Sequence, residues 1–285
     1  MNKSMSEKIF DLFLQARNYH DACDLEKAAE LYKQAINLAN QHSVIPSELL
    51  DSYAELSNTL GDYETAANLY RESIRLFPSE NSSKYMALAQ LSHGHDSLDL
   101  YKKGIALLKK NQEDEGIKSQ IASAYAAISE LFMTDLCDEP NAESTCELCI
   151  KNALKFDDTC IDAYQILANL RLIRGNYAEA RDAMEKFKTI LLHCGVFNLP
   201  SSQSLGESSR TLVELEDWDG VLFVCDVGLS IDDTQNELIY MQAFALYKLN
   251  RKQEASELLD FLSQKQLDSE LQEAVSELHK SLSEN

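Results

Sequence analysis

A cluster of cysteine and acidic side chains contains the residue types most able to do chemistry. Residues 134–149 read TDLCDEPNAESTCELC, and Cys146 and Cys149 form a C-x-x-C pair. Structural zinc needs four ligands, but Cys137 supplies only a third and no histidine lies nearby in the sequence. A thioredoxin-type redox pair needs a strand before it, whereas this pair lies in a helical pattern. We therefore predict no metal and no cofactor, and we interpret Cys146 as a small side chain packed between helices.

Catalytic signatures are missing elsewhere in the sequence as well. The chain has no phosphate-binding G-x-x-x-x-G-K loop, no G-x-S-x-G elbow and no H-E-x-x-H zinc motif. His93 and His95 flank a glycine with only Asp96 beside them, which makes a poor metal site. These observations predict a protein that is not an enzyme.

The composition is typical of a helical protein in a reducing compartment. The 285 residues include only 9 glycines and 4 prolines, and 45% of them are hydrophobic, which allows a sizeable core. We expect no signal peptide, and no run of about 18 apolar residues predicts a transmembrane helix. The odd count of 7 cysteines, without a secretory signal, predicts free thiols.

The charge of the chain is strongly acidic. It has 47 Asp and Glu against 26 Lys and Arg, which gives a formal net charge of -21. A surface of this charge repels nucleic acids and anionic membranes, so we expect neither as a direct partner, and it attracts basic proteins. The alternative is that the charge serves only solubility.

A helix-turn-helix pattern repeats along the chain. Phe187 lies 34 positions after Ala153, and Leu262 lies 34 positions after Gly228. The pattern resembles the tetratricopeptide repeat, whose period is about 34 residues. Small residues let the two helices of a repeat approach, and large ones fill the space between repeats. The small positions are Ala16, Ala28, Ala54, Ala66, Ala168, Ala180, Ala243 and Ala255, and the large ones include Tyr32, Tyr70 and Met184.

We therefore predict an all-α tetratricopeptide-repeat superhelical solenoid that forms a single domain over residues 1–285. The fourth repeat has an enlarged turn, with Pro140 in the first turn of a helix that runs from about Asn141 to Phe156 and Asp138 or Glu139 as its cap. The seven repeats lie near residues 9–40, 47–79, 80–110, 118–158, 161–192, 202–234 and 236–265, and a capping helix follows at 267–282.

Two sets of residues are candidates for binding a basic partner. The first lies in the enlarged turn, where the alternative is a solvated face that complements a helix dipole. The second lies on the first helices of three repeats, which line the concave face of a solenoid. Its aromatic side chains could bind arginine, because aromatic faces attract that cation. The alternative for these aromatics is packing between repeats. The turn set is Asp135, Asp138, Glu139 and Glu143; the groove set is Glu48, Asp51, Glu55, Asp162, Gln165, Asn169, Glu237, Tyr240, Phe244 and Tyr247.

Some features of the sequence are more specific than the repeat. The fourth repeat carries Met133-Thr134-Asp135-Leu136-Cys137, then Glu139-Pro140-Asn141-Ala142-Glu143 and Cys146-Glu147; shorter stretches are Met86 to Ser92 and Ala168 to Arg171. These residues resemble a fungal and plant family of acidic tetratricopeptide proteins, the dedicated assembly chaperones of large-subunit ribosomal protein four. The resemblance implies binding of the newly made ribosomal protein, chiefly through its long basic internal loop. It also implies escort into the nucleus and delivery to the pre-60S particle.

Our leading hypothesis is thus a monomeric, non-catalytic escort chaperone of the cytoplasm and nucleus, whose binding weakens with salt. The alternative is a tetratricopeptide scaffold or adaptor of another complex, bound through apolar groove contacts. It predicts salt-resistant binding that is lost on changing Tyr240, Phe244 and Tyr247. Clamping of an acidic peptide tail is not expected, because the corresponding positions include Asp51 and Glu55.

Overall fold

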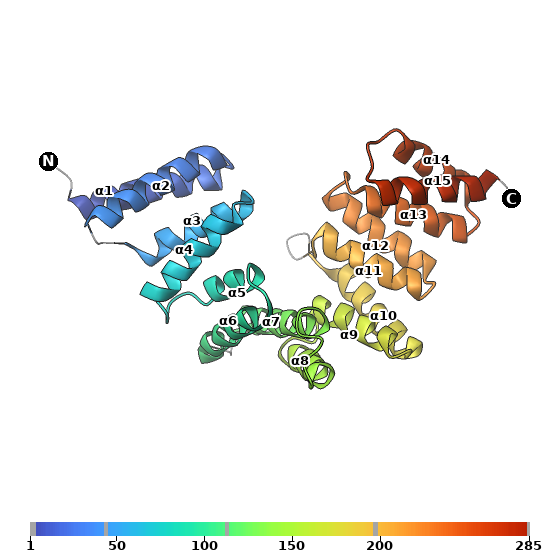
Figure 1. Ribbon diagram of the computed structural model, residues 1–285, viewed down its shortest axis with the longest axis horizontal. Coiled ribbons are helices and arrows are strands. Elements are labelled where there is room, and N and C mark those ends of the chain that lie inside the picture. The colour runs from blue at the N-terminus through green and yellow to red at the C-terminus, as the bar shows by residue number, and fades with distance from the viewer. Residues whose placement is uncertain (1–3, 43–44, 112–113, 196–198, 284–285) are drawn as a thin grey trace. The chain divides into compact units, whose positions relative to one another are not determined.

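The computed structural model describes residues 4–42, 45–111, 114–195 and 199–283. Within these ranges the chain forms fifteen α-helices and a short 3-10 helix, and no strand (Figure 1). The helices belong to two compact units, Met1–Asp158 and Thr159–Asn285. That residues 1–285 form a single solenoid domain stays a prediction.

The first unit contains four helix pairs. They are α1 (Met5–Asp21) with α2 (Leu25–His42), α3 (Ser47–Thr59) with α4 (Tyr63–Leu76), α5 (Ser83–Gln90) with α6 (Gly94–Leu108), and α7 (Glu115–Met133) with α8 (Ala142–Phe156); the 3-10 helix η1 (Lys109–Asn111) follows α6.

The second unit contains three helix pairs and a last helix. They are α9 (Ile161–Ile173) with α10 (Tyr177–His193), α11 (Ser202–Glu214) with α12 (Trp218–Ile231), α13 (Asn236–Lys248) with α14 (Lys252–Ser263), and α15 (Ser269–Ser283). A helix pair therefore lies in each of the seven predicted repeat segments.

Small residues lie buried between the helices of four of the pairs, as the sequence predicts. Each helix packs mainly against its neighbours in the sequence. Among the larger side chains, Tyr32 and Met184 are almost fully buried and Tyr70 is 5% exposed. The eight alanines at the predicted close-approach positions (Ala16, Ala28, Ala54, Ala66, Ala168, Ala180, Ala243 and Ala255) are completely buried.

The turns inside the pairs share one backbone conformation. Gly61 and Gly175 adopt positive φ angles of 76° and 71°, which glycine reaches without steric cost. At the equivalent place in other pairs the chain uses Cys23, Glu216 and Asn250, also at positive φ. The second helix begins two residues after this position in each case, so one conformation sets the helix-turn-helix geometry of five repeats.

The last helix covers the end of the second unit. Val275 and Leu278 of α15 are buried against Ile239, Leu259 and Leu262 of the preceding pair. The other residues of the predicted apolar side, Leu267, Leu271 and Leu282, pack around this cluster. The opposite side of α15 is polar and exposed, which suits a terminal cap.

Candidate functional site

The enlarged turn of the fourth repeat, residues 134–141, packs against the preceding repeat. Its only buried residue is Leu136, at 6% exposure. A Cδ atom of Leu136 would lie 3.9 Å from a Cβ placed on Gly94, the first residue of α6. Because the turn reaches across to α6, it connects two repeats.

Two carboxylates of the turn bind the start of α6. The N-cap residue His93 provides no side-chain hydrogen bond to its own helix. Instead, the backbone nitrogen of Gly94 donates to Asp135 Oδ2 at 2.9 Å, and His93 Nδ1 lies 3.8 Å from the same oxygen. His95 Nε2 lies 3.0 Å from Glu139 Oε1. We call this set, Asp135, Leu136 and Glu139 against His93, Gly94 and His95, the inter-repeat contact.

The inter-repeat contact gives two of the predicted partner-binding residues a role inside the fold. An acidic side chain satisfies an orphan backbone donor at a helix N-terminus and complements the helix dipole. Asp135 does this for a helix 41 residues earlier in the chain. Asp138 of the same turn and Glu143 of the first turn of α8 are exposed.

The predicted start of α8 is wrong in detail. The helix begins at Ala142, with Asn141 as an N-cap residue that makes no side-chain hydrogen bond. Pro140 precedes the helix, and neither Asp138 nor Glu139 caps it. The physical reason is that the turn closes through its own backbone: Glu139 donates to the Leu136 carbonyl at 3.2 Å, and the Glu139 carbonyl accepts from Ala142 at 2.9 Å.

Cys146 and Cys149 are buried packing residues of this repeat, as interpreted for Cys146 from the sequence, whereas Cys137 is exposed. Cys146 is 1% exposed, and its sulfur lies 3.0 Å from the hydroxyl of Ser129 on α7. Burial raises the pKa of the Cys149 thiol to about 11, and the neighbouring Cys146 adds to the shift. A thiol of this pKa is protonated at neutral pH and is a poor metal ligand or nucleophile. In the part of the chain that the structure describes, no group of three or more His, Cys, Asp or Glu residues could hold a metal ion.

The predicted acidic residues of the second repeat divide into two kinds. Asp51 accepts hydrogen bonds from Ser73 at 2.6 Å and Asn81 at 2.7 Å. The same network contains Lys84, whose side chain is almost fully buried and donates to the Phe77 carbonyl at 2.7 Å. Burial lowers the pKa of Lys84. Asp51 thus holds two repeats together, whereas Glu48 and Glu55 are exposed.

In the fifth repeat, the predicted polar residues connect α9 to α11. Gln165 accepts a hydrogen bond from Ser204 at 3.3 Å. Asn169 Oδ1 accepts from Thr211 at 2.6 Å. Asp162 is half-buried, and this burial raises its pKa. Gln165 and Asn169 therefore hold two repeats together, and Asp162 is partly shielded from solvent.

In the seventh repeat, the predicted aromatics form a row along α13. Tyr240 stacks on Phe244 with ring centroids 6.4 Å apart, and both rings, with Tyr247, pack around the cluster under α15. All three are half-buried. Glu237 is exposed and forms an ion pair with Arg210 of α11. The row supports packing and still presents ring surface to solvent.

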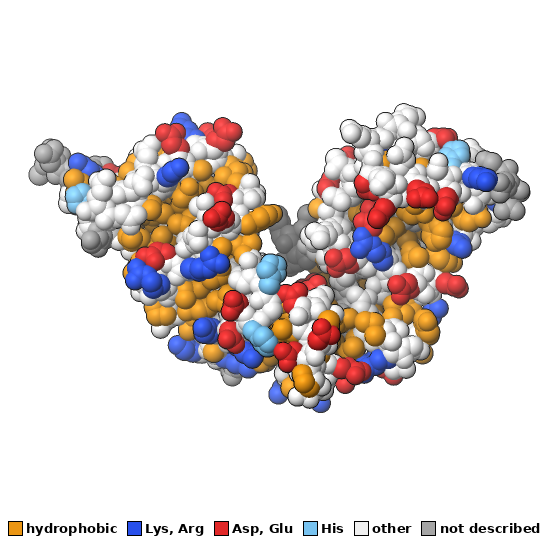
Figure 2. All heavy atoms as spheres, viewed as in Figure 1, with side chains coloured by type: hydrophobic (Ala, Val, Ile, Leu, Met, Phe, Trp, Pro, Cys, Tyr) orange, Lys and Arg blue, Asp and Glu red, His pale blue; other side chains and the backbone are white. Residues whose placement is uncertain are grey.

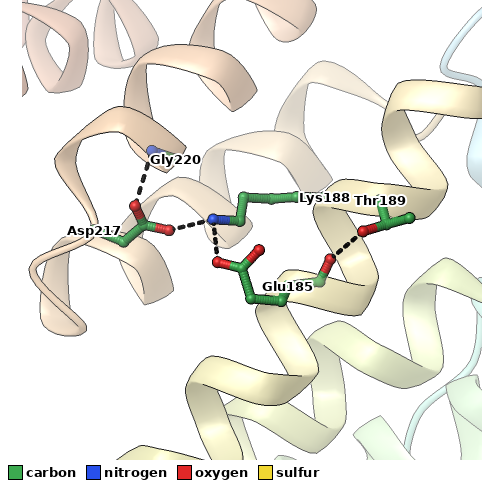
Figure 3. Close-up of polar contacts among 5 residues, drawn as sticks. All are labelled: Glu185, Lys188, Thr189, Asp217 and Gly220. Carbon is green, nitrogen blue, oxygen red and sulfur yellow. Dashed lines mark hydrogen bonds and ion pairs between the residues drawn. The ribbon is translucent and has the colours of Figure 1, made fainter.

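An ion-pair network missed by the sequence analysis joins α10 to α12 (Figure 3). Lys188 donates to Glu185 at 2.7 Å and to Asp217 at 2.6 Å. The second oxygen of Asp217 accepts from the backbone nitrogen of Gly220 at 3.0 Å and caps α12. The Asp-x-x-Gly pattern signals the cap, but nothing in the sequence pairs Asp217 with a lysine 29 positions earlier.

Carboxylates are visible at several places on the face of the molecule that Figure 2 shows. Figure 2 shows acidic, basic and apolar side chains interspersed over the face in view. No described helix is long and apolar enough to cross a membrane.

Comparison with known proteins gives a relative in fission yeast. A "Probable assembly chaperone of rpl4" from Schizosaccharomyces pombe is 36% identical over 206 residues, which cover 68% of this chain and 60% of that protein. A protein of the same name from Emericella nidulans is 26% identical over 196 residues, 65% of this chain and 50% of its own length. The chain belongs to this family. It spans about half to three fifths of the length of these relatives.

Solved structures show the same fold for the family and for this chain. The structure titled "Assembly Chaperone of RpL4 (Acl4) (Residues 1-338)" aligns with a TM-score of 0.73, covering 87% of this chain and 99% of that one at 23% identity. A tetratricopeptide repeat protein from Parabacteroides merdae aligns with a TM-score of 0.55 over 98% of this chain at 15% identity. The predicted all-α tetratricopeptide fold and the family resemblance are confirmed. No protein-family model matches the chain.

The family assignment leaves the partner-binding residues as predictions. Both relatives are named as chaperones, which agrees with the prediction of a protein that is not an enzyme. Within the family fold of this chain, Asp51, Asp135, Glu139 and Asn169 make contacts between repeats. Exposed carboxylates such as Glu48, Glu55 and Asp138 are the better candidates for contact with a partner.

Proposed function

We propose that this chain is an assembly chaperone of large-subunit ribosomal protein four. It binds the newly made basic protein as a monomer, keeps it soluble and releases it on delivery to the pre-60S particle. The observation that carries the proposal is membership of a family whose relatives are named for this task. The net charge of the chain, -21, is complementary to that of a basic client protein.

Charge complementarity supplies the physical reason for such a task. A long basic segment repels itself and attracts nucleic acid before assembly. An acidic protein neutralises that segment and raises the rate of encounter with it. Because exposed charges are screened beyond about 8 Å at physiological ionic strength, the affinity is expected to fall with added salt.

The exposed carboxylates on the first helix of the second repeat and in the enlarged turn are the proposed contacts. Glu48 and Glu55 lie on α3 about two helical turns apart, and Asp138 lies at the tip of the turn. Removing their charge leaves both the hydrogen bonds of Asp51 and the inter-repeat contact in place. These three residues therefore separate partner binding from folding.

Co-expression with ribosomal protein four tests the proposed function. The full chain is expected to raise the soluble fraction of the ribosomal protein and to co-purify with it at low salt. The variant Glu48→Gln/Glu55→Gln/Asp138→Asn should do so less, with its helix content unchanged. A chain that leaves the ribosomal protein insoluble would overturn the proposal. Salt-resistant capture of another protein, lost on changing Tyr240 and Tyr247, would favour a scaffold instead.

We propose further that the chain works in the cytoplasm and the nucleus, since the client is made in one and assembled in the other. Fluorescence imaging of the tagged chain, with and without export inhibition, tests this. Accumulation in the nucleus when export is blocked is the expected result. A chain that stays wholly cytoplasmic under that block would contradict the nuclear part.

A further inference from the structure

The second unit contains an aromatic pair that already holds a cation. Trp218, the first residue of α12, meets Phe244 of α13 edge to face, with ring centroids 5.8 Å apart and planes at 77°. The ammonium nitrogen of Lys248 lies 5.7 Å from the Trp218 centroid and 5.1 Å from the Phe244 centroid. We call Trp218 and Phe244 the aromatic site. It is a place where the negative faces of two rings stabilise one positive charge.

The same construction occurs independently in the first unit. Tyr125 and Phe156 stack with centroids 6.0 Å apart, and Lys109 Nζ lies 5.3 Å and 5.5 Å from them. There the ammonium also donates a hydrogen bond to the Tyr125 hydroxyl at 2.9 Å. Lys248 has no such anchor: in the described parts of the chain its ammonium makes no hydrogen bond or ion pair. A competing cation can therefore displace Lys248 without breaking a polar contact.

The sequence around Trp218 is acidic. Trp218 lies within the sequence Glu214-Leu215-Glu216-Asp217-Trp218-Asp219, so four of its five neighbours in this stretch are carboxylates. Lys188 neutralises Asp217 at 2.6 Å. Glu214, Glu216 and Asp219 are exposed. A basic segment passing this turn would meet both rings and net negative charge.

Arginine fits this site better than lysine does. A guanidinium is planar, stacks on aromatic faces and is more weakly hydrated than an ammonium, so less solvation is lost on binding to a ring. Tryptophan is the ring that binds cations best. An arginine that displaces Lys248 also gains hydrogen-bond donors that the lysine lacks, which the neighbouring carboxylates can accept.

We propose that the aromatic site binds an arginine side chain of an extended basic peptide, and that Lys248 occupies the site in the free chain. This inference rests on the proposed function and names a contact for it. In the free protein Lys248 covers the rings from water. In the complex the arginine takes its place and the lysine moves into solvent.

The intrinsic fluorescence of the chain reports directly on this site, because Trp218 is its single tryptophan. The probes are an octapeptide of alternating glycine and arginine and the same peptide with lysine. We expect the arginine peptide to change Trp218 emission and to bind about threefold or more tighter than the lysine peptide. Equal affinities, or binding without a change in emission, would overturn the proposal.

Two lysine variants give a matched comparison. Lys248→Met removes the cation from the aromatic site, and Lys265→Met removes the same charge from a lysine that lies 4.7 Å from the single ring of Phe261. Both variants raise the affinity for a basic peptide slightly through net charge. Only Lys248→Met should raise it by a further two- to threefold for the arginine peptide. Identical effects of the two variants would contradict a role for Lys248 as the resident occupant.

A ring variant separates this inference from the proposed function. Phe244→Leu should weaken the arginine peptide about three- to tenfold, consistent with the loss of one cation-ring contact. If wild-type chain and Phe244→Leu capture ribosomal protein four equally well, the aromatic site is not a client contact and the proposed function stands. If neither captures it, the proposed function fails, and the peptide titrations still decide the chemistry of the site. Should Phe244→Leu unfold, the two lysine variants decide it.

Discussion

The carboxylate of Asp135 accepts a hydrogen bond from the backbone nitrogen of Gly94 at 2.9 Å and so caps a helix of the preceding repeat. Leu136 beside it is buried, and Glu139 meets His95. The enlarged turn of the fourth repeat therefore ties two repeats together. Its acidic residues have two different tasks: those that face α6 support the fold, and those that face solvent are available to a partner.

The double variant Asp135→Asn/Glu139→Gln tests the structural half of this division. It removes the charge-assisted contacts to Gly94 and His95, and we expect it to lower the free energy of unfolding by about 1–2 kcal/mol. Urea denaturation followed by circular dichroism measures this. Asp138→Asn is the matched control, because it removes an exposed charge from the same turn. Equal stability of the two variants would contradict the role of the inter-repeat contact.

The aspartates that cap α4 and α12 form a second matched pair. Asp62 accepts a hydrogen bond from the Thr65 nitrogen at 3.2 Å, and Asp217 accepts one from the Gly220 nitrogen at 3.0 Å. Asp217 additionally binds Lys188, whose side chain is 18% exposed. Replacement by alanine should cost about 1 kcal/mol at Asp62 and about 2 kcal/mol at Asp217.

A double-mutant cycle with Lys188→Met isolates the ion-pair part of that difference. We expect a coupling energy of about 1 kcal/mol between positions 188 and 217. Thermal denaturation of the wild type, the two single variants and the double variant provides the measurement. Additive effects at the two positions would show that the contact in Figure 3 adds nothing to stability.

Alkaline pH should destabilise the first unit through its buried tyrosines. Burial raises the pKa of Tyr70 and Tyr101 to about 12. Their neutral form is favoured by the fold, so the stability that they contribute is complete below the unfolded pKa near 10 and is lost as pH rises toward 12. Burial lowers the pKa of Lys84, so this residue makes the folded state more stable as pH rises toward its unfolded pKa of about 10.5. The net fall is therefore expected above that pH.

Tyr101→Phe tests the alkaline prediction with Tyr63→Phe as its control. Tyr101 is 6% exposed and Tyr63 is 59% exposed. The urea midpoint of Tyr101→Phe should fall less steeply above pH 10.5 than that of the wild type, and Tyr63→Phe should follow the wild type. The same slope in all three proteins would show that ionisation of Tyr101 is not linked to unfolding.

The sequence predicts the periodic part of this molecule well. Alanines such as Ala54 and Ala180 mark the helix contacts, because only a small side chain permits the close approach. The helix starts at Tyr63 and Tyr177 follow from the Gly-Asp and Gly-Asn turns. These features are local or repeat at a fixed spacing, and each repeat contacts chiefly its neighbours.

The individual contacts between repeats could not be predicted. The partners of Asp135 and Glu139 lie 41 and 44 residues away, and they meet only because an irregular turn folds back on α6. Lys84 looks like a surface residue in the sequence, but carbonyls at the end of α4 and the nearby Asp51 make a polar site for it. Such pairings depend on side-chain geometry at non-periodic positions, and periodicity carries no information about them.

The salt dependence of binding to ribosomal protein four tests the central claim most directly. The affinity of the wild-type chain for the basic internal loop of that protein would be measured by calorimetry from low to high salt, beside Glu48→Gln/Glu55→Gln/Asp138→Asn. The account predicts tight binding that weakens steeply with salt in the wild type, and weaker binding with a shallower salt dependence in the variant. Absence of binding at low salt, or equal affinities and salt dependences of the two proteins, would contradict it.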